Sequence, residues 1–229
     1  MSQSEAAEPL PETRLILIRH GESVSAVERR IGGPRTCGGL SELGRAQAER
    51  LRDRFAADDE FVPDLLIASH YPRADQTARL MAPGLGGLDV VTDDGFGEHD
   101  PGPELDGTSY REYVERFGTP NWDGDPHAEL FVGGGETTAE FQLRVGASLT
   151  RVLREHRGSL IVISCHGGVI DTAFRRFLNT PPTGAFALHT LNASITEFRA
   201  PAAGNASLIR YNDSSHLAGL PTETPRSEA

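Results

Sequence analysis

Short apolar runs and longer stretches of helical spacing alternate along this chain. There are three such runs, each four residues long, at residues 15–18, 65–68 and 160–163. A continuous aliphatic run of this length is typical of a strand that is buried on both faces of a sheet. We therefore predict a strand at each of the three positions.

Apolar residues recur at helical spacing after every run, within residues 43–55, 74–81 and 169–177. A further helix is predicted before the third run, where Thr137 and Glu140 have the spacing of a capping box. Strands that alternate with helices form a largely parallel sheet with helices on both faces. The pattern thus predicts an α/β fold, a three-layer α/β/α sandwich with a mostly parallel sheet.

Two other parts of the pattern complete the predicted fold. Residues 194–198 and 207–211 are β-prone, and we predict that they pair at a sheet edge. Residues 93–135 differ from all of these segments, because Gly, Pro and Asp are interleaved with aromatic residues there. We interpret this stretch as an irregular lid or specificity insertion over the sheet.

The two ends of the chain carry few large apolar residues. Residues 1–12 and 218–229 are rich in Ser, Glu, Pro and Ala, so burial there cannot offset the entropy of ordering. We predict disordered tails at both ends and a single folded domain over residues 13–217. A length of 229 residues suits one domain of this class.

Composition excludes several classes of protein. All 22 basic residues are Arg, so there is no lysine for a P-loop, a Schiff base or pyridoxal phosphate. A formal net charge of -11 argues against binding to nucleic acid or an anionic membrane, and no stretch has a signal-peptide or membrane-spanning pattern. Two cysteines without a C-x-x-C pair suit a reducing compartment. We expect a cytoplasmic protein whose partners are small molecules.

Polar clusters follow the three predicted buried strands. They are RHGE at residues 19–22, SHYPR at residues 69–73 and SCHGG at residues 164–168. In an open α/β sheet, ligands bind beyond the carboxyl ends of the strands. The clusters are therefore expected to bring two histidines and two arginines into one crevice.

The residue types in that crevice fit phosphoryl transfer. Arg19 and Arg73 each offer a planar, permanently charged fork of donors that suits a phosphate dianion. Beside them, a neutral ring nitrogen of His20 can attack phosphorus, because the arginines disfavour the protonated imidazole. A single histidine at a strand end is more often structural, but RHG together with a second strand-end HGG favours a catalytic site.

These motifs resemble the histidine phosphatase superfamily, also called phosphoglycerate mutase-like. RHG, ASHYPRADQTA and HGG occur in the family order, together with LSELGRAQA, GGGET, NASITEF and YNDSSHL, and the resemblance covers about residues 14–217. It implies a phosphoglycerate mutase-like fold. It also implies that His20 is the nucleophile, that Arg19 and Arg73 bind phosphate, and that His166 contacts the phosphoryl group.

The resemblance implies two further site residues. Gly167 lies in the HGG segment and is expected to bind substrate. Glu98 takes the position of the acid that protonates the leaving oxygen, but its segment has an apparent extra residue, which leaves Glu104 and Asp106 as alternatives. A second departure is Ala26, six residues after the nucleophile, where many relatives carry an asparagine that helps to hold phosphate.

Two rival sites are less consistent with the sequence. Cys165 is adjacent to His166, but neighbouring residues of a strand point to opposite faces, so we predict an inert, buried thiol. Glu98, His99 and Asp100 are possible metal ligands, but their spacing matches no ligand signature. We predict a site that holds no metal and needs no cofactor.

We therefore predict a metal-independent phosphomonoesterase that acts on a small phosphorylated metabolite through a phosphohistidine on His20. The span from Glu98 to His166 is short for a phosphoglycerate mutase, which is retained as an alternative. A catalytically silent phosphate-binding or interaction module is a second alternative, although such relatives tend to lose the nucleophile or an arginine. The identity of the substrate and the oligomeric state are left open.

Overall fold

A mostly parallel sheet runs through the centre of the protein. The computed structural model describes residues 12–57, 61–184, 186–201 and 205–223. In this part of the chain the sheet has six strands in the order β3-β2-β4-β1-β5-β6. The first four in that order are parallel, β5 is antiparallel to β1, and β6 is antiparallel to β5. The strands are β1 (Thr13–Arg19), β2 (Leu65–Ala68), β3 (Val90–Thr92), β4 (Leu160–Cys165), β5 (Ile195–Ala200) and β6 (Ser207–Asp213).

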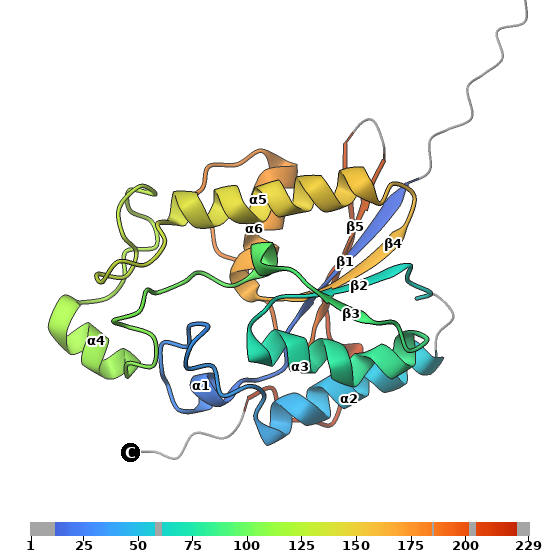
Figure 1. Ribbon diagram of the computed structural model, residues 1–229, viewed down its shortest axis with the longest axis horizontal. Coiled ribbons are helices and arrows are strands. Elements are labelled where there is room, and N and C mark those ends of the chain that lie inside the picture. The colour runs from blue at the N-terminus through green and yellow to red at the C-terminus, as the bar shows by residue number, and fades with distance from the viewer. Residues whose placement is uncertain (1–11, 58–60, 185, 202–204, 224–229) are drawn as a thin grey trace, which may run out of the picture.

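Helices cover both faces of the sheet (Figure 1). Helices α2 (Glu42–Ala57) and α3 (Pro72–Met81) pack on one face. Helices α5 (Thr138–Glu155) and α6 (Gly167–Leu178) pack on the other, which confirms the predicted three-layer α/β/α sandwich. The shorter elements are helices α1 (Val24–Val27) and α4 (Tyr110–Phe117) and the 3-10 helices η1 (Ala82–Leu85), η2 (Asp94–Phe96) and η3 (Ser215–Leu217).

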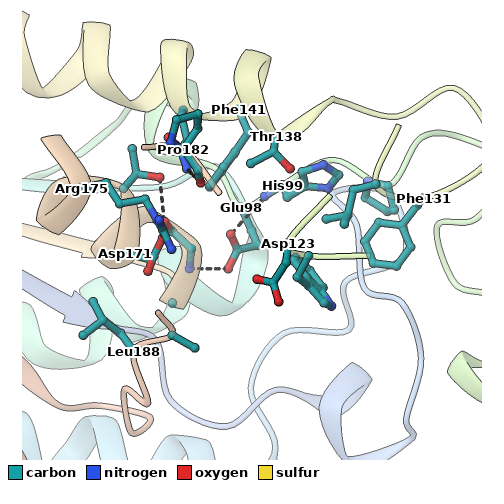
Figure 2. Close-up of a pocket in the computed structure, with 18 of the residues that line it drawn as sticks. Glu98, His99, Asp123, Phe131, Thr138, Phe141, Asp171, Arg175, Pro182 and Leu188 are labelled. Carbon is teal, nitrogen blue, oxygen red and sulfur yellow. Dashed lines mark hydrogen bonds and ion pairs between the residues drawn. The ribbon is translucent and has the colours of Figure 1, made fainter. Parts of the chain in front are cut away.

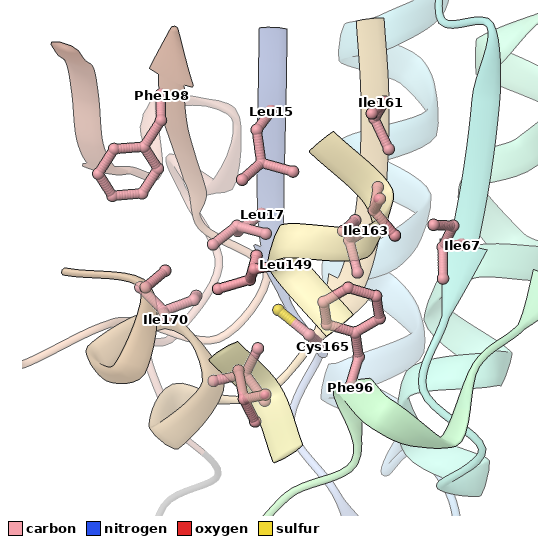
Figure 3. Close-up of a cluster of buried hydrophobic side chains, with 14 of the residues drawn as sticks. Leu15, Leu17, Ile67, Phe96, Leu149, Ile161, Ile163, Cys165, Ile170 and Phe198 are labelled. Carbon is pink, nitrogen blue, oxygen red and sulfur yellow. The ribbon is translucent and has the colours of Figure 1, made fainter. Parts of the chain in front are cut away.

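The central strands are buried on both faces, because their aliphatic residues alternate between two cores. In β1, Leu15 and Leu17 belong to the core under α5 and α6, which Figure 3 shows. Ile16 and Ile18 belong to the core under α2 and α3. Burial of each such side chain stabilises the fold by about 1.5–3 kcal/mol, so these alternating side chains strongly favour one register.

Local sequence signals set several helix ends. Helix α5 opens with the predicted capping box, in which Glu140 N donates to Thr137 Oγ1 (3.2 Å) and Thr137 N donates to Glu140 Oε2 (2.9 Å). Helix α3 begins at Pro72, where a missing N–H removes no helical hydrogen bond. Helix α6 ends before Asn179, which has the left-handed conformation (φ 53°) common at this position.

The strand pair β5 and β6 confirms the predicted edge hairpin, but two elements were not expected. Strand β3 pairs with β2 over only three residues, which is too few for a readable hydrophobic alternation. Helix α4 lies within residues 93–135, so this insertion is not wholly irregular. Its Tyr113 packs with Leu105 and Phe131 in a small third apolar cluster.

The tail predictions fall mainly outside the described part of the chain. Residues 1–11 and 224–229 are not described, and residues 218–223 continue from η3 as turns and bends. None of the described helices is both long enough and apolar enough to cross a membrane.

Candidate active site

Three of the residues predicted from sequence meet at the carboxyl edge of the sheet. His20 follows β1 and His166 follows β4, and these two strands are parallel neighbours. The centroids of their imidazole rings are 5.0 Å apart in an edge-to-face arrangement. Arg73, in the first turn of α3, donates from Nε to His20 Nε2 at 3.1 Å. All three side chains are buried.

The hydrogen bonds of His20 determine its tautomer. Its Nδ1 lies 2.7 Å from Gly21 O, and a carbonyl oxygen can only accept, so Nδ1 carries the proton. Nε2 then has a lone pair, which accepts the hydrogen bond from Arg73. Burial lowers the pKa of His20 well below its ordinary value, and the charges of Arg73 and Arg19 lower it further. His20 is therefore a neutral imidazole whose unprotonated nitrogen, Nε2, lies next to a guanidinium.

Two buried nitrogen atoms beside His20 have no hydrogen-bond partner among the described residues, Arg19 Nε and His166 Nδ1. A second nitrogen of Arg19 donates to Thr190 O. His166 Nε2 lies 2.8 Å from Ser69 Oγ, and a hydroxyl that donates there leaves Nδ1 as the protonated nitrogen. An unpartnered buried donor costs about 1–3 kcal/mol, so an anion with several acceptor oxygens would stabilise this edge.

Close packing at the end of β1 holds His20 in place. Gly21 approaches α2 so closely that a Cβ on it would lie 2.4 Å from Gly44 O. Asn192 Nδ2 donates to His20 O at 2.9 Å. The RHG, LSELG and NASITEF segments therefore share a structural role, which is to fix the backbone of the candidate nucleophile.

Glu98 lines a cavity of about 450 Å³ that begins next to this cluster. Its Oε2 accepts from Gly168 N at 3.2 Å, in the first turn of α6 (Figure 2). A Cβ on Gly168 would lie 2.3 Å from Glu98 Oε1, so the second glycine of HGG leaves room for the carboxylate. Gly167 also lines the cavity and lies near Arg19.

The other two candidate acids have different surroundings. Asp106 accepts from Gly33 N at 2.8 Å and from Arg35 N at 2.7 Å, so its two oxygens stabilise the loop that precedes α2. Glu104 is exposed and is not among the residues that line the cavity. Of these three described carboxylates, Glu98 is the one that faces the cavity.

Arg144, which the sequence did not single out, holds the segment that carries Glu98. Its guanidinium donates at 3.2–3.3 Å to four backbone carbonyl oxygens, those of Asp94, Gly95, Gly97 and Glu98. It also pairs through two nitrogens with Glu136, at 2.7 Å each. Glu136 Oε2 accepts in turn from Asp100 N at 3.1 Å. The GGGET motif thus supplies the counter-ion of this clamp, and that motif was the available sequence signal.

Replacing Arg144 with Leu should lower kcat by about 10- to 100-fold, because a shift of the Glu98 segment by about 1 Å is enough for such a loss. Lys at this position should recover part of the activity, since it keeps the charge but not the fork of donors. Steady-state kinetics and thermal unfolding would be measured together. Arg154→Leu is the control, because Arg154 is an exposed residue of the same helix. A folded Arg144→Leu enzyme with unchanged kcat would contradict this positioning role.

The remaining sequence expectations have simple structural outcomes. Ala26 is exposed on α1. Cys165 lies in the core under α5 and α6 (Figure 3), and burial raises the pKa of its thiol. The ring of His99 packs against Phe141, with centroids 5.8 Å apart. Within the described residues, no group of three His, Cys, Asp or Glu side chains is arranged to hold a metal ion.

Arginines and a neutral imidazole at the carboxyl edge of an α/β sheet suit the binding and transfer of a phosphoryl group. A family model described as the histidine phosphatase superfamily, branch 1, matches residues 15–214. The chain belongs to this superfamily and is a phosphatase-class enzyme.

Individual relatives carry both phosphatase and mutase names. The chain is 28% identical over 218 residues to phosphoglycerate mutase-like protein 4 of Arabidopsis thaliana, which covers 92% of this chain and 90% of that protein. It is 25% identical over 191 residues to a metal-independent phosphoserine phosphatase of the same plant, with coverages of 80% and 74%. The solved structure of Bacillus stearothermophilus YhfR has a TM-score of 0.73 at 26% identity and covers 90% of this chain and 99% of its own.

Proposed function

We propose that the enzyme is a phosphomonoesterase that transfers the phosphoryl group of a small phosphate ester first to His20 and then to water. The observation that supports this most is the hydrogen bond that unprotonated His20 Nε2 accepts from Arg73 Nε at 3.1 Å. A nucleophile next to a guanidinium is what attack on a phosphate dianion requires. Arg19 and His166 supply two more buried donors for phosphoryl oxygens.

In the first step, Arg73 Nε transfers its hydrogen bond from His20 Nε2 to a phosphoryl oxygen. The lone pair of His20 Nε2 then forms a bond to phosphorus, and the bond from phosphorus to the ester oxygen breaks. The electron pair of that bond goes to the leaving oxygen, which takes a proton from the carboxyl group of Glu98. The proton stays on His20 Nδ1, and its hydrogen bond to Gly21 O keeps the ring oriented during attack. Arg19 and Arg73 stabilise the charge on the three remaining phosphoryl oxygens.

In the second step, the carboxylate of Glu98 takes a proton from water, and the water oxygen attacks phosphorus. The N–P bond breaks and its electron pair returns to His20 Nε2, so inorganic phosphate forms and the acid is restored. Two displacements through a covalent intermediate replace one difficult attack by water on a dianion. The same two residues, in reversed roles, therefore complete the cycle.

Water is proposed as the final acceptor because the segment between Glu98 and His166 is short for a lid that must retain the first product. The test supplies 3-phosphoglycerate and an aryl phosphate in parallel and measures inorganic phosphate and 2-phosphoglycerate separately. Release of inorganic phosphate from either ester supports the proposal. Rapid formation of 2-phosphoglycerate with little free phosphate would make the enzyme a mutase, the function that one relative's name suggests.

Removal of divalent metals should leave the rate of phosphate release unchanged, within about two-fold. Two guanidiniums and buried imidazole donors already supply the positive potential that a metal ion gives in other phosphatases. The measurement compares dialysis against a strong chelator with dialysis against buffer alone. Activity that is lost with the chelator and restored by a single divalent ion would disprove metal independence.

A further inference from the structure

The cavity beside Glu98 has walls that the phosphoryl-transfer step does not use. Apolar side chains from the loop between α1 and α2, the insertion, α5 and the loop after α6 surround it, and they include Ile31, Trp122, Leu130, Phe131, Phe141 and Leu188. Figure 2 shows Phe131 on one side of Glu98 and Leu188 on the other. Since the acid that would protonate the leaving oxygen lines this cavity, the leaving alcohol must extend into it.

Charged groups in the cavity wall do not favour an anionic alcohol. Arg175 is the single arginine among the described lining residues, and its Nε donates to Asp171 at 2.5 Å. Its other two nitrogens donate to backbone carbonyl oxygens, Pro181 O at 2.8 Å and Phe186 O at 2.9 Å. The charge of Arg175 is therefore offset by Asp171, and each of its three nitrogens already donates a hydrogen bond before any ligand binds.

The other polar groups of the cavity wall do not favour an anionic alcohol either. Asp123 adds negative charge to the wall of the cavity. Burial lowers the pKa of His99, so this lining imidazole is neutral at pH 7. Gln142 Nε2 already donates to Pro182 O at 2.7 Å. A carboxylate in this cavity would lose water, and the one arginine of the described lining already has a carboxylate as its counter-ion.

We infer that the enzyme selects phosphate esters of uncharged, largely apolar alcohols and discriminates against esters whose alcohol carries a carboxylate, such as phosphoserine or 3-phosphoglycerate. This inference rests on the proposed function and specifies its substrate class. A cavity of about 450 Å³ is within the usual range for small-molecule sites and accommodates an aromatic ring or a medium alkyl chain. Trp122 and Phe131, whose rings pack edge to face at 5.9 Å, form one wall of the selective surface.

The first test uses n-alkyl phosphates from ethyl to octyl, because all of them release a primary alcohol of nearly equal intrinsic reactivity. We expect kcat/KM to rise about two- to four-fold for each methylene until the chain fills the cavity. Phosphoserine and 3-phosphoglycerate should react more slowly than propyl phosphate. If kcat/KM did not change with chain length, or if the carboxylate esters reacted faster than propyl phosphate, the inference would be overturned while the phosphatase function stayed intact. Absence of phosphate release from every ester would instead overturn the proposed function.

The second test removes one apolar wall. Trp122→Ala should reduce kcat/KM for octyl phosphate about five- to ten-fold and leave ethyl phosphate unchanged. Trp122 is 59% exposed, so the substitution leaves the core intact. Tyr110→Ala is the control, because this half-exposed aromatic lies outside the cavity. An equal loss on both esters would overturn the assignment of Trp122 to the alcohol site.

The third test restores a free cation. Asp171→Asn removes the carboxylate that neutralises Arg175, so the ratio of kcat/KM for 3-phosphoglycerate to that for propyl phosphate should rise several-fold. Asp75→Asn is a matched control: Asp75 and Arg79 form the same i,i+4 pair on α3, and the two aspartates are 26% and 25% exposed. An unchanged ratio in Asp171→Asn would contradict the role of local charge in excluding carboxylates.

Discussion

His20→Ala should abolish turnover, with kcat for phosphate release at least about 10⁴-fold lower than in the wild-type enzyme. Losses of this size follow removal of a nucleophile, because only binding and transition-state electrostatics remain. The substitution also removes the acceptor of the Arg73 hydrogen bond, but the alanine fits the space and the fold should persist. Phosphate release under saturating ester, with circular dichroism as a check on folding, measures the effect.

The position of the covalent intermediate can be tested on the same proteins. Wild-type enzyme quenched during turnover should carry phosphate in an acid-labile linkage, as an N–P bond does, and His20→Ala should carry none. Cys165→Ser is the control for the rival nucleophile and should keep most of the activity, because the thiol lies in the core and burial raises its pKa. Active His20→Ala together with inactive Cys165→Ser would show that the nucleophile has been wrongly assigned.

Glu98→Gln should slow hydrolysis about 10²- to 10⁴-fold for alkyl phosphates, whose alkoxide needs a proton as it leaves. For p-nitrophenyl phosphate the first step should be almost unaffected, since the nitrophenolate leaves without protonation. The amide preserves the size of the side chain and can still accept from Gly168 N, so the geometry changes little. Pre-steady-state release of the alcohol, compared across leaving groups of graded pKa, isolates this step.

Glu104→Gln is the matched control for this experiment, because Glu104 is an exposed carboxylate of the same segment. In Glu104→Gln, the rate of alcohol release should depend on the pKa of the leaving group as it does in the wild-type enzyme. If the rate of alcohol release depended more steeply on leaving-group pKa in Glu104→Gln, but not in Glu98→Gln, Glu104 would be the acid. Asp106 is not a suitable control, because it accepts hydrogen bonds from Gly33 N and Arg35 N, and its loss would also disturb the loop before α2.

The sequence predicted the sheet well where its signal was local. The aliphatic runs of β1, β2 and β4 are unbroken because both faces of these strands are buried, so every position of the run must be apolar. The capping box at Thr137 required only two residues at a fixed spacing. Strand β3 was missed because an edge strand of three residues is too short to show a hydrophobic alternation.

The functional roles of arginines were harder to predict, because a guanidinium acts through whatever it reaches in space. Arg19 and Arg73 could be proposed from the sequence because each lies within five residues of a strand end, in a segment that also contains a histidine. Arg144 was missed, since its partners Glu98 and Glu136 belong to different segments. Nothing in the spacing of α5 distinguishes Arg144 from the exposed Arg154 on the same helix.

By itself, the sequence determined the order of strands and helices, the strand-end motifs and the superfamily, because these depend on period, composition and short-range spacing. Only the tertiary structure decided the tautomer of His20, which of the three carboxylates lines the cavity, and the pairing of Arg175 with Asp171. Each of these depends on which polar atom lies within about 3 Å of which other, across segments that are far apart in the chain. A hydrophobic pattern specifies which face of an element is buried, but not which buried polar groups meet there.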